Sequence, residues 1–384
     1  MPIITSGIII AERLPSEFFV SDASLFNINT ALPVSIHAEN DNVSSGYNAQ
    51  LKLMGVIPIK NISIRVVEQK YVSLCGTPFG VKIFTDGVMV VGLGDIYTEK
   101  GTSNPAKKAK IEIGDIIVSI NNKEVYNNNE VAKLIETSNG KPLELVLIRH
   151  GKKQTCTLTA VLSTDDGLYK AGMWIRDSSA GIGTLTFINE KENTFGGLGH
   201  GICDIDTGNI IPLSCGEIVP VTLTEITKSS AGKPGELKGF LNDTTLGNLC
   251  ANSEKGVYGN VVSSYTKNTY AVAPKHEIIE GDALVLTTLP GKETKFYSCK
   301  IEKINYDQKN LTRNLIVKIT DEQLLDITGG IVQGMSGSPI VQNGKFIGAI
   351  THVFVNNPAL GYGIFAENML TAAEQYTANS KIAS

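Results

Sequence analysis

Hydrophobic and polar residues alternate along much of this chain, in short segments that glycine, asparagine and aspartate residues separate. The segment from Gln50 to Val67 is an example, and alternation with a period of two is typical of half-buried β-strands. Such segments are dense from about residue 164 to about residue 365, at the spacing that is typical of a pair of β-barrels or a β-sandwich. The pattern therefore predicts a mainly β protein.

Three segments predict helices instead. Residues 104–109 begin with Asn104 as an N-cap and Pro105 in the first turn, residues 128–137 form a second segment, and residues 368–378 form a third near the end of the chain. Two strands, the short helix, a strand, the second helix and a closing hairpin follow one another in residues 76–163. This order, and the turn from Ala109 to Ile117, resemble a bacterial PDZ domain.

A PDZ domain binds an extended peptide as an added strand at an exposed sheet edge. By this resemblance, the carboxylate-binding loop is expected at Phe79, Gly80 and Val81, with Ile83 on the strand that follows. The groove would then lie between residues 80–84 and the helix at 128–137. The alternative is a structural α+β module without a ligand.

The expected domain organisation has four parts. Residues 1–47 are weakly patterned and predict a partly disordered extension, and residues 48–75 predict a β lead-in segment. The PDZ domain follows at 76–163, and a polar break at Thr164 to Gly167 marks the start of a peptidase domain at 164–384.

The composition excludes several classes of protein. The chain has 384 residues, 42% of them hydrophobic, and a formal net charge of -4, so a nucleic-acid interface is not expected. The six cysteines are scattered without a Cys-x-x-Cys pair, so we expect no metal site and no cofactor. No run of about 18 apolar residues predicts a spanning helix. Residues 1–10 lack the features of a signal peptide, so we expect a protein made without one or a chain that lacks its natural start.

The segment from Gly329 to Ile340 carries the strongest chemical signal. Ser336 lies in it, with Gly334 two residues before and Gly337 directly after. In the chymotrypsin architecture, the oxyanion hole consists of the N–H of the nucleophilic serine and the N–H of a glycine two residues earlier, which here are Ser336 and Gly334. The alternative is a Gly/Ser-rich loop between strands. An Asn343-Gly344 hairpin turn is predicted just after this segment.

A serine nucleophile needs a base, and the chain has five histidines. Glycines flank His200 on both sides, and His200 precedes Ser336, as the histidine does in chymotrypsin-like enzymes. His352 follows Ser336 on the next predicted strand and is the alternative. Position does not choose the acid among the carboxylates between His200 and Ser336, which include Asp204, Asp206, Glu217, Asp243, Asp282, Asp321 and Asp326.

The motifs at residues 195–201, 329–340, 352–355 and 361–364, together with the segment from Thr77 to Ile83, resemble the SpoIVB-type serine peptidases, which contain a PDZ domain. The resemblance covers about residues 48–375. It implies a PDZ domain followed by a chymotrypsin-like double β-barrel, with a triad of His200, Asp321 and Ser336. Asp321 is the least specific match, because it lies where chymotrypsin-like enzymes build specificity loops.

The resemblance also implies a role in regulatory proteolysis during endospore formation. Peptidases of this family act in the space between the forespore membranes, where they cleave an extracytoplasmic segment of a membrane protein and so activate an intramembrane protease and sigma-K. They also cleave themselves. The expected partners are therefore a protein substrate and a PDZ ligand, which could be this chain's own N-terminal segment. The alternative is an inactive adaptor that binds peptides through its PDZ domain. Ser336 and His200 are both present with glycines around them, which favours the peptidase.

Overall fold

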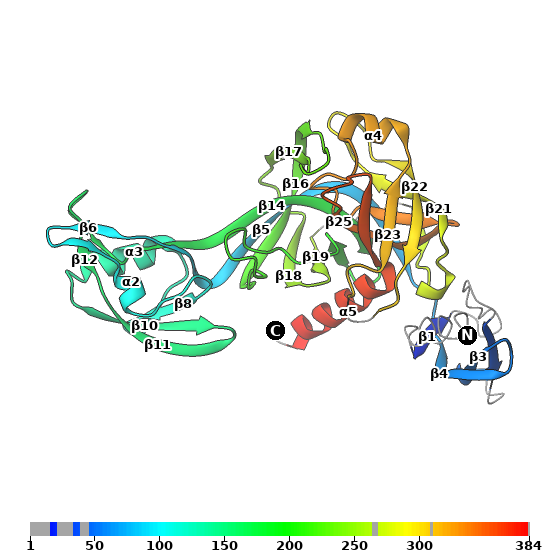
Figure 1. Ribbon diagram of the computed structural model, residues 1–384, viewed down its shortest axis with the longest axis horizontal. Coiled ribbons are helices and arrows are strands. Elements are labelled where there is room, and N and C mark those ends of the chain that lie inside the picture. The colour runs from blue at the N-terminus through cyan, green and yellow to red at the C-terminus, as the bar shows by residue number, and fades with distance from the viewer. Residues whose placement is uncertain (1–15, 21–33, 39–45, 263–267, 308–309, 383–384) are drawn as a thin grey trace. The chain divides into compact units, whose positions relative to one another are not determined.

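A computed structural model describes residues 16–20, 34–38, 46–262, 268–307 and 310–382 (Figure 1). The chain forms two compact units, and each is assembled from separate stretches of sequence. The barrel unit consists of residues 1–80, 182–200 and 219–384, and the inserted unit of residues 81–181 and 201–218. The boundaries expected at residues 76 and 164 differ from this division, because three strands pass from one unit into the other.

A small mixed β-sheet forms the start of the barrel unit in the sequence. It contains β1 (Glu17–Val20), β2 (Val34–Ala38), β3 (Gly46–Leu53) and β4 (Ile57–Val66), in the order β1-β4-β3-β2. Phe18, Leu51 and Ile64 are fully buried in its core. Two segments of the expected N-terminal extension are therefore strands, and the other residues up to 45, apart from Ser16, lie outside the described residues.

The first barrel is a ring of six strands. In order around the ring they are β5 (Tyr71–Leu93), β14 (Met173–Asn189), β15 (Thr194–Gly197), β19 (Gly256–Val261), β18 (Gly247–Ser253) and β16 (Cys215–Thr227), and β16 pairs again with β5. Two further strands extend it, β17 (Glu236–Leu241) beside β16 and β20 (Thr269–Ala271) beside β5.

The second barrel is closed and contains β21 (Gly281–Thr287), β22 (Lys295–Ile304), β23 (Leu315–Ile319), β26 (Leu360–Phe365), β25 (Lys345–Val353) and β24 (Pro339–Gln342). The short helices η2 (Lys275–Glu277) and α4 (Glu322–Thr328) lie before β21 and between β23 and β24. Asn343 and Gly344 join β24 to β25, both with positive φ, which confirms the predicted two-residue turn.

Helix α5 (Ala366–Ile382) confirms the predicted terminal helix. Its buried residues Met369 and Ala373 share one apolar cluster with Tyr258 of β19 and Phe346 of β25. The helix therefore packs against both barrels, which meet at the site described below. No helix among the described residues is both long and apolar enough to cross a membrane.

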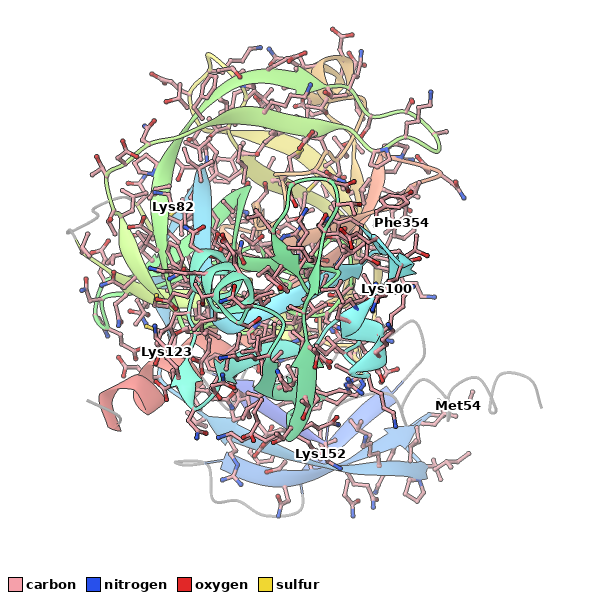
Figure 2. The ribbon with its side chains drawn as sticks, turned by 90° about the vertical axis from the view of Figure 1, so that its left-hand side faces the viewer. Met54, Lys82, Lys100, Lys123, Lys152 and Phe354 are labelled. Carbon is pink, nitrogen blue, oxygen red and sulfur yellow. The ribbon has the colours of Figure 1, made fainter. Side chains whose placement is uncertain are left out.

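The inserted unit mixes a sheet with two helices, as predicted for residues 76–163. The sheet has the order β11-β10-β8-β5, and α3 begins after the N-cap Asn127 and buries Val131 and Ile135 against it. Lys100, Lys123 and Lys152, labelled in Figure 2, mark three of its hairpin turns. Besides parts of β5, β14 and β16, its elements are β6 (Ile96–Thr98), β7 (Gly101–Ser103), α2 (Pro105–Lys108), β8 (Ile116–Ile120), β9 (Lys123–Glu124), α3 (Asn128–Thr137), β10 (Pro142–Arg149), β11 (Lys152–Thr159), β12 (Val161–Leu162) and β13 (Tyr169–Lys170).

Candidate active site

Ser336 lies in the tight loop that leads into β24. Gly334 and Gly337 both have φ near +95°, at +96° and +94°, which L-residues rarely adopt. A Cβ atom on Gly337 would lie 2.1 Å from the carbonyl oxygen of Thr184, so glycine is required there by space as well as by conformation. The loop therefore has a fixed shape that the sequence dictates.

Two amide groups of this loop have N–H groups without a partner among the described residues. The Gln333 carbonyl accepts the Leu237 N–H at 2.9 Å, and the Met335 carbonyl accepts the Ser338 N–H at 3.0 Å. Because N–H and C=O point in opposite directions in a trans peptide, the N–H groups of Gly334 and Ser336 point away from these partners. Neither N–H donates a hydrogen bond to any described residue.

Threonines of the first barrel hold the same loop from the other side. The Thr184 N–H donates to the Ser336 carbonyl at 2.9 Å, and the Thr184 hydroxyl donates to the Gly334 carbonyl at 2.7 Å. The Thr186 hydroxyl donates to the Gly337 carbonyl at 2.7 Å. Both threonines lie on β14, and sequence analysis did not select them because a threonine in an alternating strand carries no local signal of function.

The Ser336 hydroxyl donates to the carbonyl oxygen of Thr351 at 2.6 Å. Ser336 is partly exposed, so a substrate carbonyl can reach its oxygen. In this arrangement the proton is directed at a main-chain acceptor on β25. The side chain must therefore turn before the proton can pass to an imidazole.

His200 and His352 lie together beside this serine. Their ring centroids are 4.7 Å apart with the planes tilted by 36°, and His352 directly follows Thr351, which accepts the Ser336 hydroxyl. His200 follows β15, and Gly199 before it has φ +70°. The structure thus brings both candidate histidines and the candidate nucleophile to one place where the two barrels meet.

The two histidines differ in their fitness as a base. Desolvation, followed by the nearby positive charges of His200 and Arg313, lowers the pKa of His352 to about 4. The His352 residue is exposed, so water still reaches part of its ring. A base works best when its pKa lies near the working pH, and His352 is therefore the weaker candidate.

Asp321, the expected acid, is the N-cap of α4. One of its carboxylate oxygens accepts the Leu324 N–H at 2.9 Å, and the other accepts the Ser298 N–H at 3.3 Å. These contacts are those of a helix cap. The part that Asp321 takes in a triad stays a prediction from the resemblance.

Several other carboxylates that were open as candidates have partners elsewhere. Asp204 and Asp206 bind Arg176, Glu217 binds Lys82, and Asp326 lies near Lys228, while Asp243 and Asp282 are exposed. Within the described residues, no cluster of three His, Cys, Asp or Glu side chains could hold a metal ion.

The expected carboxylate-binding loop at Phe79 to Val81 is not a loop. These residues and Ile83 lie within the continuous strand β5, and Phe79, Val81 and Ile83 are almost fully buried. A Cβ atom on Gly80 would lie 2.5 Å from the Leu241 side chain, inside the barrel unit. This expectation is wrong because β5 continues through residues 79–83 and its apolar side chains there are buried in hydrophobic cores.

The inserted unit has a groove at a different place. A cavity of about 380 Å³ lies between α3, which contributes Ala132, Ile135 and Glu136, and the turn and strand at residues 168–175. Gly94, Asp95 and Ile96 line its end. Sequence analysis expected a groove between the helix at 128–137 and residues 80–84, whereas the cavity beside α3 has residues 168–175 opposite the helix.

The turn that enters this groove carries two unpaired amides. The carbonyls of Ala171 and Gly172 accept N–H groups from Ala106 and Gly94, at 2.8 and 3.0 Å. The N–H groups of Ala171 and Gly172 donate to none of the described residues. Gly172 has φ +74°, and successive free N–H groups in such a turn form a concave anion site.

Comparison with known protein families gives two matches. The SpoIVB peptidase S55 family matches residues 167–370, which is more than half of the chain. The PDZ domain family matches residues 103–149.

Individual relatives are more distant. A stretch of 73 residues is 34% identical to a "Putative zinc metalloprotease" of Thermotoga maritima, and it spans 19% of this chain and 13% of that protein. The PDZ domain of the SdrC-like protein from Listeria monocytogenes aligns over 24% of this chain and 90% of that one, with 17% identity and a TM-score of 0.20. An inactive serine-to-alanine mutant of Rv3671c from M. tuberculosis aligns over 43% and 82%, with 13% identity and a TM-score of 0.27.

Proposed function

Because the chain belongs to the SpoIVB peptidase S55 family and is a serine-type endopeptidase with a PDZ domain, we propose how its own residues perform the reaction. Ser336 is the nucleophile and His200 the general base. The observation that supports this assignment is the loop that carries Ser336, in which the N–H groups of Gly334 and Ser336 donate to no described residue.

The reaction begins when the Ser336 hydroxyl leaves the Thr351 carbonyl and turns its proton towards His200. The oxygen then attacks the substrate carbonyl, and the N–H groups of Gly334 and Ser336 bind the oxyanion that forms. His200 holds the proton and delivers it to the leaving amine. His352, with its lowered pKa, stays neutral beside the imidazolium that His200 becomes.

Labelling with a fluorophosphonate tests this assignment, because the reagent reacts only with a serine that has both a base and an oxyanion hole. We expect one label per chain, on the peptide that contains Ser336. A purified, folded chain that takes up no label would instead support the inactive adaptor.

We also propose that the peptidase acts in regulatory proteolysis during endospore formation, on an extracytoplasmic segment of a membrane protein. The cleavage would activate an intramembrane protease and sigma-K, and the chain would also cleave itself near its N-terminus. Membership of the SpoIVB family supports this role. The test is complementation of an endospore-forming strain that lacks its own SpoIVB-type peptidase, with the chain secreted into the space between the forespore membranes. Restored sporulation supports the role, whereas secretion of a labelled chain without restoration contradicts it.

The acid of the triad can be tested separately from the cap. Asparagine caps a helix about as well as aspartate, so Asp321→Asn keeps α4 in place and removes only the charge. The contacts of Asp321 are those of a cap, so we expect kcat/KM to stay within about 10-fold of the wild type. A loss on the order of 10⁴-fold, as for a triad acid, would assign that role to Asp321.

A second proposal concerns the groove between α3 and residues 168–175, which we propose as the peptide site of the PDZ domain. An extended peptide would add to β14 as a strand, and its carboxylate would bind the free N–H groups of Ala171 and Gly172. The ligand is the tail of a protein substrate or this chain's own N-terminal segment.

Replacing Gly172 with alanine tests the groove. A Cβ there would lie 2.6 Å from the Gly94 carbonyl oxygen, so the turn must move and its amides lose their alignment. We expect hexapeptides with a free carboxylate and a terminal Val, Leu or Phe to bind at least about 10-fold more weakly, because two charge-assisted hydrogen bonds are lost. Fluorescence anisotropy measures this affinity.

The matched control is Gly167→Ala, which has a similar φ of +72° but no atom within 4 Å of the added Cβ. It should bind the peptides as the wild type does. Ala132→Trp blocks the opposite wall without changing the turn, and should also weaken binding. Normal binding by both Gly172→Ala and Ala132→Trp would remove the groove from consideration.

A further inference from the structure

The segment that directly follows His200 is part of the inserted unit. Residues 201–218, here named the His200 loop, separate residues 182–200 of the barrel unit from residues 219–384 in the sequence. The Ser214 N–H donates to the Phe84 carbonyl at 2.9 Å, and the Lys82 ammonium binds Glu217 at 3.0 Å. The end of the loop is therefore fixed to β5 within the inserted unit.

The beginning of the loop is organised around Asp204, which is 2% exposed. One oxygen of its carboxylate accepts the N–H groups of Asp206 and Thr207, at 3.1 and 2.9 Å, and the other binds Arg176. Burial acts to raise the pKa of Asp204, but the hydrogen bonds from Thr207 and Arg176 outweigh it and hold the pKa below its ordinary value. Asp204 is thus a charged group that both shapes the loop and anchors it.

Arg176 makes this anchor from β14. Its guanidinium binds Asp204 with one nitrogen and Asp206 at 2.8 Å with another, so it holds two residues of the loop at once. Arg176 comes directly after Trp174 and Ile175, which line the proposed peptide groove. The first residues of β14 therefore carry both a wall of the groove and the cation that holds Asp204, which lies four residues after His200.

We propose that Arg176 is a positioning residue for His200, and that a peptide in the groove changes the reactivity of Ser336 through the contact between Arg176 and Asp204. The inference rests on the proposed peptidase site and the proposed groove. A peptide that adds to β14 as a strand orders the residues that carry the guanidinium. The contact between Arg176 and Asp204 then restricts the His200 loop. It thereby restricts the approach of the His200 imidazole to Ser336.

Coupling of this kind is reciprocal. If peptide binding favours the arrangement in which Ser336 reacts, then covalent occupation of Ser336 must raise the affinity of the groove for the peptide by the same factor. A residue that merely supports the fold would not produce this second effect.

The experiment measures the rate of fluorophosphonate labelling of the full chain, with and without a saturating hexapeptide that has a free carboxylate and a terminal Val, Leu or Phe. In the wild type we expect the peptide to accelerate labelling. In Arg176→Gln we expect a basal rate on the order of 10-fold to 100-fold lower, since a small displacement of a catalytic group has effects of this size. We also expect no response to the peptide.

A double-mutant cycle shows whether Arg176 acts through Asp204. Asp204→Asn should reduce labelling as Arg176→Gln does, and the double variant should be no slower than either single one. Arg176→Lys keeps one cationic contact and should recover part of the rate. Arg149→Gln is the matched control, because it removes an arginine from another buried aspartate of the inserted unit, Asp115, and leaves the contacts of Asp204 in place.

Labelling of Arg176→Gln at the wild-type rate, or additive losses in the double variant, would overturn the inference while the proposed peptidase stands. An equal loss in Arg149→Gln would also overturn it, because general destabilisation of the inserted unit would then suffice. Absence of any label in the wild type would instead reject the proposed function itself. Thermal unfolding of each variant shows that the compared chains are folded.

Discussion

Replacing Ser336 with alanine is expected to abolish fluorophosphonate labelling and to lower the rate of peptide-bond cleavage on the order of 10⁴-fold or more. The reason is that the alanine variant loses the nucleophilic oxygen and leaves every other part of the site in place. The hydroxyl makes one hydrogen bond, to the Thr351 carbonyl, so its removal should cost about 1 kcal/mol of stability. Self-cleavage should stop as well, which mass spectrometry of the purified chain measures.

Ser338→Ala is the control for this prediction. Ser338 lies in the same glycine-rich segment, but it is fully buried and its hydroxyl donates to Thr287 at 3.2 Å. Its variant should be less stable than the wild type and should still be labelled at Ser336. Cleavage by Ser336→Ala at a normal rate would show that the site has been assigned to the wrong serine.

Replacing His200 with alanine should have an effect of similar size, because Ser336 then has no base to take its proton. We expect a loss on the order of 10⁴-fold in kcat/KM, measured on a fluorogenic peptide selected from a library. The free N–H groups of Gly334 and Ser336 remain in this variant, so substrate should still bind. The loss should therefore fall on kcat rather than on KM.

His352 provides the comparison, since its ring contacts the ring of His200. His352→Phe preserves a ring that can contact His200, and the lowered pKa of His352 makes it the weaker base. We expect its kcat/KM to remain within about 10-fold of the wild type. If His352→Phe is the variant that loses 10⁴-fold and His200→Ala is not, the two roles are exchanged, although the mechanism is the same.

Local sequence signals predicted much of this protein correctly. Asn104 and Asn127 cap α2 and α3, the Asn343-Gly344 turn joins β24 to β25, and α5 closes the chain, because each of these depends on a few neighbouring residues. The glycines around Ser336 are an equally local signal. Gly334 and Gly337 occupy backbone conformations that other residues rarely adopt, so their spacing around a serine already describes the shape of the loop.

The errors concern strands whose partners are distant. β5 and β14 each run through both units, and the alternation of their residues is the same whichever unit they join. Phe79 was therefore read as part of a binding loop when it is buried in a strand. The groove itself uses residues 168–175, beyond the boundary that a polar turn suggested.

The sequence by itself determined the class of fold, the helices and tight turns, the shape of the loop around Ser336 and the glycines beside His200, because short-range sterics and hydrogen bonding govern these features. Only the tertiary structure decided which carboxylates have basic partners, which residues lie opposite α3 in the cavity of the inserted unit and which unit contains the His200 loop. Arg176 and Asp204 are 28 residues apart, and the preference of each for a partner is too general to identify the other. Their pairing depends on how the strands close, which is a property of the whole chain.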